Sequence, residues 1–83
     1  MSAAHPVTDH DQIRKWAEKH GGRPAMVDTE GKGGILRLDF QEKDEKLTEI
    51  NWDEFFRIFE ERKLALLLPE DGKSRFNKFV SRH

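Results

Sequence analysis

The chain has 83 residues and a formal net charge of −1, with 37% of its residues charged and 35% hydrophobic. A chain of this length forms one domain and buries only about 60–65% of its unfolded surface. It contains no cysteine, which excludes disulfides, cysteine-ligated metals and a thiol nucleophile and favours a cytoplasmic location. No apolar run approaches the roughly 20 residues that span a bilayer, so we expect no membrane association.

Residues 1–7 lack the basic and apolar segments of a signal peptide, and their low complexity predicts a disordered N-terminal lead. We expect residues 8–83 to form a single α+β domain. Its first element is a helix that begins at Thr8 or Asp9, where Asp9 with Gln12 reads as a capping box. Gly21 and Gly22 end this helix. Its apolar stripe has helical spacing and consists of Ile13, Trp16, Ala17 and His20.

Two strands are expected next, over residues 23–29 and 35–40. The second alternates strictly, with Leu36 and Leu38 on one face and Arg37 on the other. The glycine-rich stretch "EGKGG" between them predicts a hairpin turn. The segment "GKGG" within it lacks the spacing and the following helix of a phosphate-binding P-loop. A polar loop, "QEKDEK", follows the hairpin.

The clearest helix signal begins at Asn51, a good N-cap whose capping box is completed by Glu54. Arg62 and Lys63 lie at its C-terminal end, where cations suit the helix dipole. The run "LALLL" that follows predicts a strand buried on both faces, central in its sheet. The apolar face of the helix is rich in rings and consists of Trp52, Phe55, Phe56, Ile58 and Phe59.

The C-terminal stretch "SRFNKFVSRH" fits two structures. As a helix capped by Ser74, it places Phe76, Phe79 and Val80 on one face, and this is the cleaner pattern by periodicity. A strand that forms a hairpin with "LALLL" is the alternative. In either case we predict a small, mainly antiparallel sheet of three strands, made from the three apolar segments and packed against the two amphipathic helices.

The sequence offers no convincing catalytic set. The aromatic side chains are needed for the core of so small a domain, since burying one large ring contributes about 1.5–3 kcal/mol. The carboxylates lie in a polar loop, at helix caps and on a helix surface, so a solvated face is the simplest interpretation. His5, Asp9, His10 and Asp11 show no closed metal-ligand spacing. We therefore expect no catalytic residue, metal or cofactor.

Charge is unevenly distributed along the chain. Residues 38–61 hold 3 basic and 9 acidic side chains, whereas residues 62–83 hold 6 basic and 2 acidic ones. If the C-terminal stretch is helical, Arg75, Lys78 and Arg82 fall within about 60° of one another around its axis. With Lys73 and Arg23 nearby, they form a candidate surface for an anionic partner. Pairing of these cations with the acidic segment is the alternative.

Four stretches match a known group in order and spacing over nearly the whole chain after Val7. They are "DHDQIRKWAEKHGGRPAMV", "GGILRLDF", "INWDEFFRIFEERKLALLL" and "GKSRFNKFVSR". The chain resembles a group of small, uncharacterised bacterial proteins, some of which carry the label "1,4-alpha-glucan branching enzyme". No stretch matches the catalytic motifs of branching enzymes, so the resemblance implies no catalytic residue. It implies a bacterial, cytoplasmic protein of one domain.

We expect a non-catalytic interaction module that binds an acidic partner, an as yet unknown protein, through its basic C-terminal surface. A nucleic-acid-binding accessory protein is an alternative, although the near-neutral net charge argues against tight binding. A glucan-associated protein or small enzyme is the other alternative, and glucan binding would require exposed Trp16 and Trp52.

Overall fold

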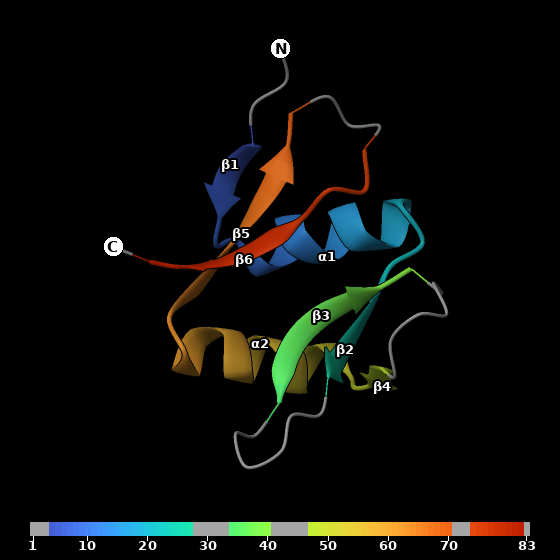
Figure 1. Ribbon diagram of the computed structural model, residues 1–83, viewed down its shortest axis with the longest axis vertical. Helices are drawn as coiled ribbons and strands as arrows, with labels where there is room; N and C mark the ends of the chain where they lie inside the picture. Colours follow the sequence, from blue (N-terminus) through green and yellow to red (C-terminus); the bar gives the residue numbers. More distant parts are fainter. Residues whose placement is uncertain (1–3, 28–33, 41–46, 71–73, 83) are drawn as a thin grey trace.

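The computed structural model describes residues 4–27, 34–40, 47–70 and 74–82 (Figure 1). Over these residues the chain is an α+β protein with two helices and two antiparallel three-stranded sheets. One sheet has the order β1-β5-β6 and the other the order β3-β2-β4. The elements are β1 (Ala4–Val7), α1 (His10–Lys19), β2 (Arg23–Val27), β3 (Ile35–Asp39), β4 (Leu47–Glu49), α2 (Trp52–Glu61), β5 (Leu64–Pro69) and β6 (Lys78–Ser81).

Both sheets and both helices share one hydrophobic core. In Figure 1 the β1-β5-β6 sheet lies above the β3-β2-β4 sheet, with α1 running behind β6 and α2 beside β3. Phe55 and Phe59 of α2 are completely buried at its centre. The other side chains of this core cluster come from β1, α1, β3, α2 and β5, and they are Val7, Ile13, Ala17, Leu36, Leu38, Ile58, Leu66 and Leu68.

The two helices begin where the sequence predicts. The Asp9 carboxylate caps α1 by accepting a hydrogen bond from the backbone N–H of Asp11 at 3.0 Å. The Asn51 side chain caps α2 and accepts from the backbone N–H of Glu54 at 2.7 Å. Gly21 follows the C-terminal end of α1 and has a φ of 77°, a conformation that glycine adopts without steric cost.

The predicted hairpin of β2 and β3 is confirmed, and so is the alternation in β3, where Leu36 and Leu38 are buried and Arg37 is exposed. The expected turn and polar loop lie outside the described residues. The predicted α+β class, with antiparallel strands packed against two helices, is confirmed, but the three predicted strands do not share one sheet. β4 is a short strand that periodicity does not reveal, and it pairs with β2 and completes a separate sheet. β5, which is central as expected, belongs to the other sheet.

The predicted disordered lead is also wrong for residues 4–7, which form β1. This strand pairs with β5 from Ala4 opposite Pro69 to Val7 opposite Leu66. Val7 reaches the core with only 5% of its surface exposed. The local sequence of residues 4–7 has little preference for a strand. The free edge of the apolar strand β5 nevertheless supplies backbone hydrogen-bond partners, and this pairing outweighs the weak local preference.

The C-terminal stretch forms the alternative strand, not the helix favoured by periodicity. β6 pairs antiparallel with β5, with Leu66 opposite Phe79 and Leu67 opposite Lys78. The Phe79 ring turns inward and lies 6.0 Å and 6.5 Å from the ring centres of Phe55 and Phe59. Strand pairing together with this ring packing decides against the helix, because tertiary contacts outweigh a weak helical pattern.

The cap of α2 gives a direct test of the fold. Asn51→Ala removes the acceptor for the Glu54 N–H, so we expect the free energy of unfolding to fall by about 1 kcal/mol. Urea denaturation measures this change. Asn51→Asp keeps the acceptor and is the matched control. An alanine variant as stable as the aspartate variant would contradict this role of the cap.

Candidate functional site

The two faces of the β1-β5-β6 sheet differ in what covers them. Side chains alternate between the faces of a strand, and paired residues share a face. The register therefore places Val7, Leu66 and Phe79 on one face. Val7 and Leu66 are core residues, and Phe79 packs against the core. This inner face is the one that the helices cover.

The outer face of this sheet is also apolar. We use the term outer face for Pro6, Ala65, Leu67, Lys78 and Val80, which the register places together. Ala65 is buried, Leu67 and Val80 are partly buried, and Pro6 is exposed. These side chains, except Lys78, line a shallow hollow of about 660 Å³ together with Thr8, Ser81 and Arg82. An antiparallel sheet with one face in solvent normally carries polar side chains there, so this composition is unusual.

Lys78 is the exposed cation of the outer face. It lies opposite Leu67 in the β5–β6 pair. No ion pair of Lys78 is found among residues 4–27, 34–40, 47–70 and 74–82. Its ammonium group therefore remains available at the edge of an apolar surface.

Arg82, which lines the hollow, is held by Glu60 of α2. Its Nη2 donates to Glu60 Oε2 at 2.6 Å and its Nη1 to Glu60 Oε1 at 3.0 Å. Its Nε donates to the backbone carbonyl of Leu64 at 2.6 Å. The guanidinium also lies over the Phe59 ring, 5.4 Å from its centre. This fork-like geometry fixes the C-terminal strand to the end of α2.

Glu60 accepts a third contact from His10, whose Nε2 lies 2.7 Å from Glu60 Oε2. The His10 ring stacks on Phe56, with ring centres 4.1 Å apart. Hydrogen bonds from Arg82, and next from His10, lower the pKa of Glu60 to about 2. A carboxyl group that stays ionised to such low pH is a poor proton donor, so this cluster favours a structural role over acid–base catalysis.

The other predicted cations lie apart from this face. Arg23, at the start of β2, is 3.5 Å from Glu49 of β4. Arg75 lies over the Phe40 ring, 5.7 Å from its centre. Lys73 is outside the described residues. The helical stripe of Arg75, Lys78 and Arg82 does not form, because residues 78–81 are a strand. Lys78 lies on the outer face, and Arg82 lines the hollow beside it.

The prediction that the rings build the core holds for Phe55 and Phe59, which are fully buried. Trp16, Trp52 and Phe56 are partly buried and pack against the core. His20 borders the core at the end of α1 as expected, with its ring 4.4 Å from that of Trp16. Within the described part of the chain, no group of three or more His, Cys, Asp or Glu side chains is arranged to hold a metal ion.

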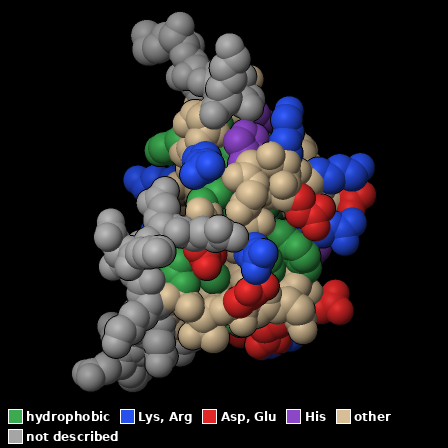
Figure 2. Space-filling view, turned by 90° about the vertical axis from the view of Figure 1, so that its right-hand side faces the viewer, with side chains coloured by type: hydrophobic (Ala, Val, Ile, Leu, Met, Phe, Trp, Pro, Cys, Tyr) green, Lys and Arg blue, Asp and Glu red, His purple; other side chains and the backbone are tan. Residues whose placement is uncertain are grey.

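The surface charges are separated over the molecule. On the face seen in Figure 2, acidic side chains gather in the lower half, at the level of α2 in Figure 1, and basic side chains lie mostly above them. Hydrophobic side chains show between the charged ones on the same face. The acidic and basic side chains of this face are thus partly separated.

No family model, curated protein or solved structure matches the chain. Within the described ranges, neither helix has the length and apolar composition needed to cross a membrane. The structure is that of a small α+β protein with an apolar outer sheet face and a cluster of charged side chains near it.

The Glu60 cluster predicts how stability depends on pH. The pKa of Glu60 is lowered in the folded protein, from 4.5 to about 2. The stability that it contributes is therefore present above pH 4.5 and is lost as the pH falls through about 2. We expect carboxyl NMR titration to place the pKa of Glu60 far below those of exposed glutamates.

Arg82→Gln should move this pKa back toward 4.5, because it removes the guanidinium whose hydrogen bonds are the largest cause of the shift. Arg14→Gln removes an exposed arginine that pairs with Asp11 and is the control. An unchanged pKa of Glu60 in the Arg82 variant would show that the contact is absent in solution.

Proposed function

We propose that this protein is a non-catalytic interaction module that binds an acidic partner protein through the outer face of the β1-β5-β6 sheet. Leu67 and Val80 supply the apolar centre of the contact, and Lys78 supplies its positive charge. Arg82 orders the end of the face through Glu60. The observation that carries the proposal is the apolar composition of a sheet face that the described helices leave uncovered.

The composition of β5 supports a covered outer face. All its residues are apolar, which is typical of strands buried on both faces. The helices of this chain lie against one face only, the face of Leu66 and Leu68. A contiguous apolar patch on a small protein is a common mark of a protein-binding surface. A partner that covers Leu67 and Val80 would give β5 the second buried face that its sequence favours.

Charge indicates the kind of partner. The register places one cation, Lys78, and no acidic side chain on the outer face. Two copies that met through this face would bring their Lys78 side chains together, which is unfavourable. A different protein with an apolar centre and acidic side chains around it is complementary in both respects.

Photo-crosslinking tests the proposal. A photoreactive amino acid replaces Leu67 in the full chain, which is then exposed to lysate of the source cells. We expect crosslinks to a protein segment that contains acidic and apolar residues, identified by mass spectrometry. The same amino acid at Lys15, an exposed position on α1, is the control and should not give this product.

Lys78→Glu should lower the affinity for the purified partner at least tenfold, because it places like charges together. Lys15→Glu makes the same change of charge on α1 and should leave the affinity unchanged. Equal affinities of the two variants, or crosslinks from Leu67 to nucleic acid alone, would contradict the proposal.

A further inference from the structure

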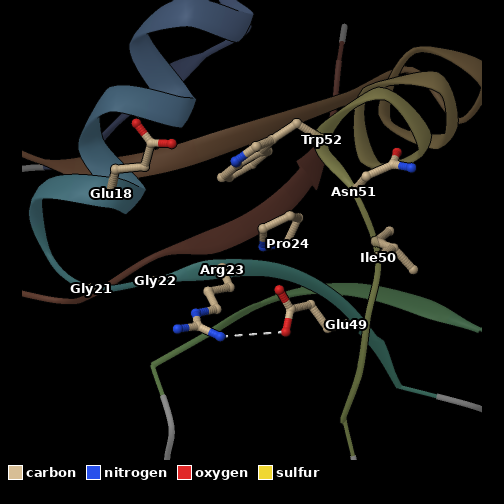
Figure 3. Close-up of a pocket in the computed structure, with 9 residues that line it drawn as sticks. All are labelled: Glu18, Gly21, Gly22, Arg23, Pro24, Glu49, Ile50, Asn51 and Trp52. Atoms are coloured by element: carbon tan, nitrogen blue, oxygen red, sulfur yellow. Dashed lines mark ion pairs between the residues drawn. The ribbon is translucent and has the colours of Figure 1, made fainter.

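A second hollow, of about 480 Å³, shares no lining residue with the first. It lies where the end of α1, the start of β2 and the beginning of α2 meet (Figure 3). Trp52 extends into it from α2, with Glu18 of α1 facing it across the hollow and Pro24 beneath it. Glu49 and Arg23 lie at its lower rim. The hollow thus combines an aromatic ring with two carboxylates and one guanidinium.

The indole of Trp52 is held in place by the core. It stacks on Phe56 with ring centres 5.4 Å apart and makes a T-shaped contact with Phe55, with ring centres 5.1 Å apart. The backbone beneath it is fixed as well, since Ile50 N–H donates to the carbonyl of Pro24 at 3.0 Å. A partly buried ring fixed in this way offers a preformed surface for stacking, with little ordering left for a ligand to impose.

The two carboxylates are available to a ligand. Glu18 is exposed, and no ion pair of its side chain is found in the described parts of the chain. Glu49 lies 3.5 Å from Arg23, but both side chains are more than half exposed. An ion pair so exposed and so long contributes little and exchanges readily with another cation. Arg23 therefore acts as an internal competitor at the rim.

We propose that this hollow binds a guanidinium group, which stacks on Trp52 and donates hydrogen bonds to Glu18 and Glu49. Tryptophan is the best aromatic partner for a cation, and a planar guanidinium stacks on it while its edge donates to carboxylates. An ammonium group lacks the flat face, and an anion would meet Glu18 and Glu49 directly. This site is independent of the outer face and does not rest on the function proposed above.

NMR titration of the full chain tests the site. The two tryptophans give two indole N–H signals, which Trp52→Phe assigns. N-acetyl-arginine methylamide is the probe for a peptide side chain, and free arginine is the probe for a small-molecule source. We expect the Trp52 signal to shift and saturate with at least one of them. The citrulline analogue has the same shape without the charge and should bind at least tenfold more weakly.

Three variants separate the parts of the site. Glu18→Gln should weaken binding of the arginine probe several-fold, whereas Glu70→Gln, the same change beyond β5, should leave it unchanged. Arg23→Gln removes the internal competitor and should tighten binding. If the citrulline probe binds as well as the arginine probe, or if Arg23→Gln weakens binding, the hollow does not recognise a guanidinium cation.

Discussion

The structure depends on one buried cluster of aromatic rings, because a chain of 83 residues has room for a single small core. Phe55 and Phe59 of α2 lie at its centre and are completely buried. Phe79 of β6 packs against both of them from one sheet. Leu36 and Leu38 of β3 join the same core from the other sheet. The helix α2 therefore holds the two sheets in one body.

This arrangement leaves the β1-β5-β6 sheet covered on one side only. Each of the two helices is 10 residues long, and both pack their apolar side chains into the shared core. The outer face of Pro6, Ala65, Leu67, Lys78 and Val80 thus remains apolar and uncovered by the described helices. The geometry that stabilises the domain is also what presents this face.

Two of the cations predicted to form one basic surface are instead paired with carboxylates of the same chain. Arg82 is fixed by Glu60 and Arg23 lies near Glu49, so each joins two elements of the fold. The acidic segment and the basic C-terminal segment therefore pair in part within the molecule. The two candidate surfaces that remain differ in sign, with Lys78 at the outer face and Glu18 at the hollow of Trp52.

The sequence by itself determined the elements whose signals are local. The caps at Asp9 and Asn51, the ring-rich face of α2 and the alternation of β3 depend on neighbours within a few residues, and all are found in the structure. The run "LALLL" also indicated that β5 carries apolar side chains on both of its faces. That run predicted a strand buried on both faces, whereas the described helices cover only the face of Leu66 and Leu68.

Only the tertiary structure decided which strands share a sheet. Residues 4–7 became a strand because β5 offers them an edge, and residues 78–81 became a strand because Phe79 meets Phe55 and Phe59. The positions of the cations follow from these pairings, so the predicted stripe of Arg75, Lys78 and Arg82 did not form. Contacts between residues far apart in the chain outweigh local preference, and periodicity records only the latter.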